Sequence, residues 1–228
     1  MMRFSIMKRH ANLVKLILMN NCKNILEIGT CRCINALPMI QTAQAFHQNV
    51  EYHGIDLFAE EMRRNPVDKT YCQGEDYIQF PMSYEEALAT LKETGAWITL
   101  HEGDSKVILA NLVTLVKHPP KFDLIRIDGD VSYEGVLADW KSCELLMHEK
   151  TIVVFDTYFE GGYVEKGVWG PNAVVDEIDR KIYDVELLDP ADIVPPLPDR
   201  SLERYKAEIG KKVTCRLVKV TKRKKGVT

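Results

Sequence analysis

Short runs rich in isoleucine and valine alternate along the chain with stretches of helical spacing, and this alternation restricts the fold more than any other feature. Seven runs are expected to form strands, at residues 24–29, 50–58, 97–103, 122–128, 151–156, 183–188 and 213–220. Five segments have helical periodicity, at residues 33–47, 83–94, 105–117, 132–147 and 173–181. Such alternation is typical of βαβ units around a parallel sheet. We therefore predict an α/β fold with a mostly parallel sheet.

Several residues mark the boundaries of these elements. Ser83 and Glu86 form a capping box, and Gly95 stands where a left-handed helix end is wanted. Pro38 is compatible with its helix if that helix begins near Asn35. The first 22 residues are expected to form an amphipathic helix. A proline-rich linker at residues 189–212 precedes the last run, so the final strand should reach the sheet from elsewhere.

The composition excludes several classes of protein. Of 228 residues, 46% are hydrophobic and 28% are charged, which excludes disordered, collagenous and disulfide-scaffold chains. A formal net charge of −3 gives no reason to expect a polyanionic partner, and the basic tail at 222–228 is expected to be solvated rather than bound to nucleic acid. No apolar stretch approaches the roughly 20 residues that cross a bilayer. We expect one cytoplasmic domain over residues 1–228, with reduced cysteines and no membrane contact.

Acidic side chains at the ends of the first two strands indicate a ligand site. Glu27 lies inside an apolar strand just before the turn residue Gly29, and a buried carboxylate there needs a donor or a cation. Asp56 ends the second strand, at the place where βαβ folds hold ribose hydroxyl groups. These two positions favour a nucleoside-type ligand.

The later strands end in further polar residues. Asp104 and Ser105 follow the third strand, where they could bind an adenine edge as well as cap a helix. Asp128 and Asp156 end the fourth and fifth strands, about 5 Å apart if the strands are neighbours, and could share one Mg²⁺ ion. The alternative is structural: Asp130 would cap the following helix and Asp156 would open a turn.

The arrangement resembles class I S-adenosylmethionine-dependent methyltransferases, in particular the metal-dependent O-methyltransferases that act on catechols and macrolide sugars. The resemblance runs from about residue 24 to residue 158, and its most specific part is the Asp-Gly-Asp-x-Ser-Tyr-Glu-Gly run beginning at Asp128. The other matching segments are Leu26-Glu-Ile-Gly-Thr30, Gly54-Ile-Asp56, Glu102-Gly-Asp-Ser105 and Ile152-Val-Val-Phe-Asp156.

The resemblance implies a fold and a set of site residues. It implies a Rossmann-like, seven-stranded sheet of order 3-2-1-4-5-7-6, with the last strand antiparallel and helices on both faces. Asp128 and Asp156 would be the metal ligands. The positions it implies for the cofactor are Glu27, Gly29 and Thr30 at the methionine part, Asp56 at the ribose, Leu57, Asp104 and Ser105 at the adenine, and Asp128 beside both cofactor and metal.

Three positions depart from the family pattern. Cys33 stands where a glycine is usual, Val131 where the general base is usual, and Thr157 where many relatives carry a second acid. The base role would then fall to Asp130, to a loop residue or to the metal alone. Two long segments, residues 59–82 and 158–172, are expected to be loops that carry function, the second as a lid over the substrate.

We therefore predict an S-adenosylmethionine-dependent, magnesium-assisted O-methyltransferase acting on a hydroxyl group of a small molecule, with a sugar preferred to a catechol. Asp128 and Asp130 are the predicted catalytic residues, and a homodimer is an expectation. Val131 and Thr157 also leave open a regulatory protein that binds the cofactor without turnover. An N-methylase is disfavoured because the Asn/Asp-Pro-Pro-aromatic motif is missing after the fourth strand. A nicotinamide dehydrogenase is disfavoured because the first turn lacks Gly-x-Gly-x-x-Gly.

Overall fold

A mixed sheet forms the centre of the molecule. The computed structural model describes residues 7–59, 82–160, 169–194 and 213–224. Its strand order is β3-β2-β1-β4-β5-β8-β6, with β7 paired to β8. Strands β1 to β5 are parallel, and β8 is antiparallel to β5, β6 and β7. The strands are β1 (Asn24–Ile28), β2 (Glu51–Asp56), β3 (Trp97–Glu102), β4 (Phe122–Ile127), β5 (Met147–Glu160), β6 (Tyr183–Leu187), β7 (Asp192–Val194) and β8 (Val213–Lys222). The predicted Rossmann-like order is confirmed, with β8 as the predicted last strand.

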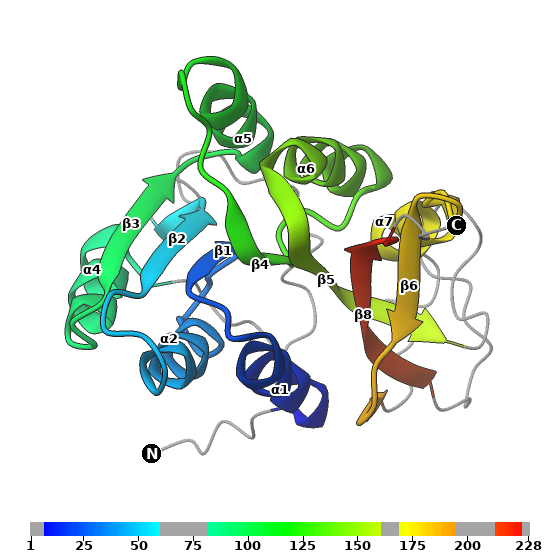
Figure 1. Cartoon of the computed structure of the whole chain (residues 1–228), viewed down its shortest axis with the longest axis horizontal. Coiled ribbons are helices and arrows are strands. Elements are labelled where there is room, and N and C mark those ends of the chain that lie inside the picture. The colour runs from blue at the N-terminus through cyan, green and yellow to red at the C-terminus, as the bar shows by residue number, and fades with distance from the viewer. Residues whose placement is uncertain (1–6, 60–81, 161–168, 195–212, 225–228) are drawn as a thin grey trace.

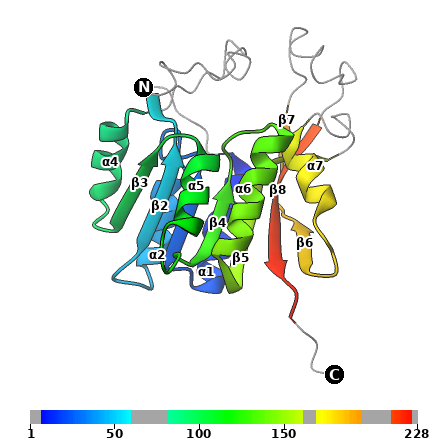
Figure 2. The same ribbon diagram turned by 90° about the horizontal axis from the view of Figure 1, so that it is seen from above.

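Helices cover both faces of the sheet (Figures 1 and 2). One apolar core lies under α1, α2 and α4, and the other lies under α5, α6 and α7. No helix in the described ranges is long and apolar enough to cross a membrane. The helices are η1 (Lys8–His10), α1 (Ala11–Asn20), α2 (Ala36–Gln44), α4 (Tyr84–Lys92), α5 (Ser105–Thr114), α6 (Tyr133–Leu146) and α7 (Gly170–Glu177).

Local sequence explains where several helices begin. The capping box of α4 is present, because Ser83 accepts from the Glu86 N–H and Glu86 accepts from the Ser83 N–H. Gly95 follows with a left-handed φ of 75°, as predicted. Helix α2 begins at Ala36 rather than at residue 33, so Pro38 lies in its first turn, where a missing N–H costs little.

Other boundaries differ from the prediction because they depend on tertiary contacts. Strand β5 extends to Glu160 because β8 pairs with it from Ile152 to Glu160. Helix α7 begins at Gly170, whose N–H donates to the Val131 carbonyl at 2.9 Å. A Cβ on Gly170 would lie 2.3 Å from the Ser132 carbonyl oxygen, so only glycine allows α7 to approach the start of α6 this closely. The two predicted functional loops fall mostly outside the described residues.

Helix α6 carries a buried acid at its contact with α5. Asp139 has an exposed fraction of 0%, and neither carboxylate oxygen is within hydrogen-bonding geometry of a described donor. Burial raises the pKa of Asp139 to about 7, although the nearby Ser105 hydroxyl opposes this shift and Asp130 and Asp104 add to it. The folded protein therefore holds a proton on Asp139 at pH values where the unfolded chain releases it.

This linkage predicts a pH-dependent effect of Asp139→Asn. A carboxyl pKa that is higher in the folded state lowers the free energy of unfolding as pH rises from about 4 to 7. Asp139→Asn has no carboxyl group to titrate at this position, so its free energy of unfolding does not fall for this reason. Between about pH 4 and pH 7 the difference in free energy of unfolding, variant minus parent, should therefore increase by on the order of 1 to 4 kcal/mol. Urea denaturation at about pH 4.5 and about pH 8, below and above the raised pKa of Asp139, measures the difference. Glu134→Gln, at an exposed position on the same helix, is the control. Equal pH dependence in all three proteins would contradict the account.

Candidate functional site

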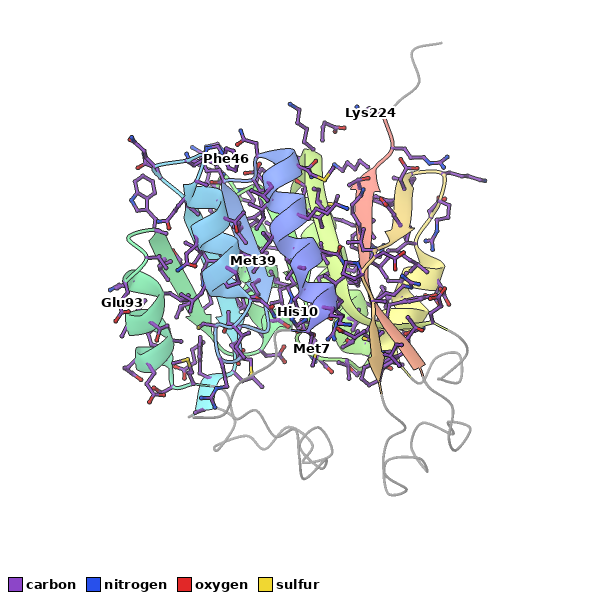
Figure 3. The ribbon with its side chains drawn as sticks, turned by 90° about the horizontal axis from the view of Figure 1, so that it is seen from below. Met7, His10, Met39, Phe46, Glu93 and Lys224 are labelled. Carbon is purple, nitrogen blue, oxygen red and sulfur yellow. The ribbon has the colours of Figure 1, made fainter. Side chains whose placement is uncertain are left out.

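The carboxyl ends of β1, β2, β4 and β5 lie along one edge of the sheet, because these neighbouring strands are parallel. This edge carries Glu27, Asp56, Asp128 and Asp156 within or just after the strands. Helix α1 runs back toward the start of β1, so its own first residues lie at the same edge. In Figure 3, Met7 and His10 accordingly lie at the opposite end of the molecule from Phe46, which follows α2.

The turn after β1 passes against the end of β4. The Gly29 N–H donates to the Ile55 carbonyl at 2.8 Å, and the Asp128 N–H donates to the Ile28 carbonyl at 2.9 Å. A Cβ on Gly29, whose φ is 88°, would lie 2.1 Å from the Asp128 carbonyl oxygen. Cys33 adopts a left-handed φ of 59°, which is costly for a residue with a side chain. Where the family pattern has a glycine, this chain has Cys33, and its side chain makes the left-handed backbone strained.

Asp56 organises this turn. Its carboxylate accepts from the Thr30 hydroxyl at 3.2 Å, from the Cys31 N–H at 2.7 Å and from the Phe58 N–H at 3.0 Å. The side chain therefore joins the end of β2 to the β1–α2 turn. The structure brings Gly29, Thr30 and Asp56 together, as predicted for a shared ligand. Leu57 is half-buried between Asp56 and Phe58.

Glu27 is fully buried and has both partners that its position requires. Tyr52 donates its hydroxyl to Oε2 at 2.5 Å, and Arg126 donates Nη1 to Oε1 at 2.6 Å. Burial raises the pKa of Glu27, although Arg126 and Tyr52 oppose the shift. The prediction that Glu27 needs a donor or a cation is confirmed. Its predicted contact with a cofactor stays a prediction, since in the structure its carboxylate supports Arg126.

Arg126 joins three of the predicted site acids, and sequence reasoning missed it. Besides Glu27, it donates Nη2 to Asp128 and, at 2.5 Å, to Asp156. Burial alone would lower the pKa of Arg126, but the three carboxylates outweigh that effect and raise it. Its place inside an apolar strand, between Ile125 and Ile127, was the available clue, because a buried arginine needs acidic partners.

Asp128 and Asp156 share Arg126 but differ in their surroundings. Burial, with help from the neighbouring Asp156, raises the pKa of Asp128 to about 7 despite Arg126. Burial would also raise the pKa of Asp156, but Arg126 and Arg9 hold it well below its usual range. The Asp128 side chain is 28% exposed whereas that of Asp156 is 0% exposed. Asp128 is therefore the acid of this pair that a bound molecule can reach.

The beginning of the chain contributes two further side chains. Arg9 Nε donates to Asp156 at 2.8 Å, and Arg9 Nη1 donates to Asp192 in β7 at 2.9 Å. His10 Nε2 lies 3.1 Å from the second oxygen of Asp156. These contacts span 146 to 183 residues of sequence, which explains why no local pattern predicted them.

A second group of predicted residues lies at the start of α5 and α6. Asp104 caps α5 by accepting from the Lys106 N–H at 2.9 Å, directly before Ser105. Asp130 accepts from both the N–H and the hydroxyl of Ser132, each at 2.8 Å, and its Oδ2 lies 3.9 Å from the Lys106 ammonium. The N-cap of α6 is Ser132, which accepts from the Gly135 N–H, so Asp130 does not cap the helix itself but holds the capping residue. The catalytic role of Asp130 stays a prediction. Asp104 and Ser105 remain predicted adenine contacts.

The donor set does not fit the predicted metal site. Asp156 faces two arginines and a histidine, and Asp128 shares the Arg126 guanidinium. Among the described residues, no three His, Cys, Asp or Glu side chains are placed to hold one ion. These side chains therefore do not fit a joint Mg²⁺ site as they stand, because a guanidinium joins the two carboxylates. Binding of Mg²⁺ by Asp128 and Asp156 stays a prediction that no finding here supports.

Comparison with solved structures places this fold among known proteins. It is similar to a proposed O-methyltransferase from Klebsiella pneumoniae, with a TM-score of 0.63 and 14% identity over 98% of this chain and 84% of that chain. It is also similar to the O-methyltransferase TomG from Streptomyces achromogenes in complex with SAM, with a TM-score of 0.56 and 13% identity over 94% and 79% of the two chains. The O-methyltransferase from Bacillus cereus in complex with SAH has a TM-score of 0.54 and 13% identity over 94% and 80%. At these identities the likeness shows the fold.

A family model identifies the chain more directly. A search of curated proteins finds no match. The model described as "Methyltransferase domain" matches residues 26–158, the same region that carries the strand-end acids and the sequence resemblance. The match covers more than half of the chain and includes Glu27, Asp56, Arg126, Asp128 and Asp156. The chain belongs to this methyltransferase-domain family.

Proposed function

We propose that the protein transfers a methyl group from S-adenosylmethionine to a hydroxyl oxygen of a small molecule. The observation that carries the proposal is the edge at which Gly29, Asp56 and Asp128 meet, on a chain of the methyltransferase family. Asp56 would hold the ribose and the exposed part of Asp128 the methionine end. Asp104 and Ser105 would lie on the adenine side. The proposal draws further support from the SAM and SAH complexes of proteins with the same fold.

The charge of this edge suits a cationic cofactor. Glu27, Asp56, Asp128 and Asp156 bring four acids together, whereas the permanent cations that pair with them are Arg9 and Arg126. The pKa of Asp128 is raised to about 7 in the unliganded protein, and a cationic ligand beside it would stabilise its ionised form. The edge therefore favours a ligand that carries a sulfonium and an ammonium group. It disfavours the pyrophosphate of a nicotinamide dinucleotide. Electrostatics thus supports the methyltransferase reading over the dehydrogenase alternative.

The reaction places modest demands on the protein. The bound cofactor supplies a methyl group that its sulfonium already activates. The chain must then hold the acceptor oxygen in line at about 3 to 3.5 Å and exclude competing water. It must also accept the proton of the hydroxyl group. The magnesium prediction is not carried into this proposal because the predicted ligands are paired with arginine.

Two described side chains are candidates for the base that accepts the proton. Asp130 is the sequence prediction, but both of its oxygens accept hydrogen bonds from Ser132. His10 is oriented by Asp156, and its Nδ1 makes no hydrogen bond to a described residue. When Nε2 carries the proton that faces Asp156, Nδ1 has a free lone pair. We therefore place the base role on His10 ahead of Asp130.

The acceptor is proposed by class. A sugar hydroxyl group remains the preferred acceptor, and this preference rests on the family branch that the sequence resembles. The predicted loop segments that would contact it lie mostly outside the described residues. The runner-up is a regulatory protein that binds the cofactor without turnover, as Val131 and Thr157 suggested. A cytoplasmic location and a homodimer also stay predictions.

Binding of S-adenosylhomocysteine tests the cofactor site. Asp56→Ala removes a charged acceptor at the predicted ribose position and loosens the turn that it holds. It should weaken binding by about 1 to 3 kcal/mol, or roughly 5- to 150-fold. Isothermal titration calorimetry measures the affinity. Glu51→Ala, at the opposite end of the same strand, is the control and should leave the affinity unchanged. An unchanged affinity in Asp56→Ala would remove Asp56 from the site.

A methyl-donor turnover assay over a panel of sugar and phenolic hydroxyl acceptors tests the reaction. With an acceptor that supports turnover, His10→Gln should lower kcat by about 10²-fold or more. The affinity for S-adenosylhomocysteine should stay close to that of the parent chain. A larger loss in Asp130→Asn than in His10→Gln would return the base role to Asp130. Cofactor binding with no turnover on any acceptor would favour the regulatory alternative.

A further inference from the structure

We propose that the guanidinium group of Arg126 takes the position, between the ends of β4 and β5, at which the sequence predicts a divalent cation. The site would then act without a metal. Arg126 is a positioning residue in this proposal: it fixes Asp128 toward the bound cofactor and acceptor. The role in methyl transfer rests on the proposed function, but the exclusion of metal can be tested without an acceptor.

The geometry of Arg126 matches that of a bridging cation. Its Nη2 atom contacts Oδ2 of Asp128 and Oδ2 of Asp156, so one nitrogen joins the two predicted metal ligands. Its Nη1 atom meanwhile binds Glu27 at 2.6 Å and lies 3.5 Å from the Gly29 carbonyl oxygen. The planar guanidinium is a permanent cation with several fixed donors, so it can hold carboxylates in a set orientation as a metal ion does.

Asp156 has no acceptor capacity left for a metal. One oxygen accepts from Arg9 Nε at 2.8 Å and from the Thr157 N–H at 2.7 Å. The other accepts from Arg126 Nη2 at 2.5 Å and faces His10 Nε2 at 3.1 Å. A carboxylate offers about four lone-pair sites. All four are used, and the side chain is fully buried.

Asp128 alone cannot supply the oxygen ligands that a metal ion would need in place of Asp156. Its Oδ2 is paired with Arg126, which leaves Oδ1 as the atom without a hydrogen bond to a described residue. Mg²⁺ requires near-octahedral oxygen coordination and would stand beside the positive charge of Arg126. Thr157, in place of a second acid, offers a hydroxyl instead of a carboxylate. The free oxygen of Asp128 is better suited to the cationic end of the cofactor.

Titration with Mn²⁺ alone tests this inference. Free Mn²⁺ is followed by electron paramagnetic resonance and the melting temperature by circular dichroism, for the parent chain, Asp156→Asn, Arg126→Met and Arg126→Lys. We expect the parent chain, Asp156→Asn and the charge-conserving Arg126→Lys to show the same weak, nonspecific association. Arg126→Met removes the bridging cation and frees one acceptor position on each of Glu27, Asp128 and Asp156. It should therefore gain one site at least about tenfold tighter, with a melting temperature that Mn²⁺ raises.

The Mn²⁺ titrations either support or overturn the proposal that Arg126 excludes a metal ion. A parent chain that binds one Mn²⁺ ion, lost in Asp156→Asn, would overturn the proposal. An Arg126→Met chain that folds but gains no site would overturn it as well, because the arginine would then not be what keeps the metal out. If Arg126→Met does not fold, an equal, weak response of the parent chain and Asp156→Asn supports the proposal. Absence of S-adenosylhomocysteine binding to the parent chain would defeat the proposed function separately and leave the Mn²⁺ result standing.

Discussion

A buried ion cluster around Arg126 determines how the functional edge of this protein is built. Guanidinium nitrogens of Arg126, near the end of β4, contact acids on β1 and β5 and Asp128 just after β4. Asp156 also pairs with Arg9 and His10. Removing one partner from such a cluster leaves an uncompensated buried charge, which is strongly unfavourable. Three strands and the beginning of the chain therefore depend on one another's charges.

This cluster also separates the roles of acids that look alike in sequence. Glu27 and Asp156 are fully buried and satisfied by protein donors, so they support the edge. Asp128 keeps part of its carboxylate exposed, and Asp56 holds the turn that Gly29 starts. Asp56 and Asp128 are the acids to which the proposed function assigns recognition of a nucleoside with a positively charged sulfur. In the proposed function, ligand binding therefore depends on the acids that the arginines do not fully pair and bury.

Most of the fold could be predicted because its determinants are local. The periodicity of apolar residues gave the strands and helices, and the Ser83–Glu86 capping box and Gly95 appear as expected. The remainder depends on contacts between distant residues. Arg126 looks like an isolated cation within an apolar strand, and Arg9 and His10 look like the polar residues of an ordinary terminal helix. The extension of β5 and the early start of α7 likewise depend on β8 and on the space beside Ser132. The poor fit of the predicted metal ligands has the same cause, because the sequence shows Asp128 and Asp156 but not the arginines buried beside them.

A crystal structure grown with S-adenosylhomocysteine and Mn²⁺, with anomalous data collected at the manganese edge, tests the central claim most directly. The account predicts the ribose beside Asp56 and the methionine end beside Asp128. It also predicts that the Arg126 guanidinium stays between Asp128 and Asp156, with no anomalous peak there. A manganese peak between the two carboxylates, with Arg126 turned away, would contradict it.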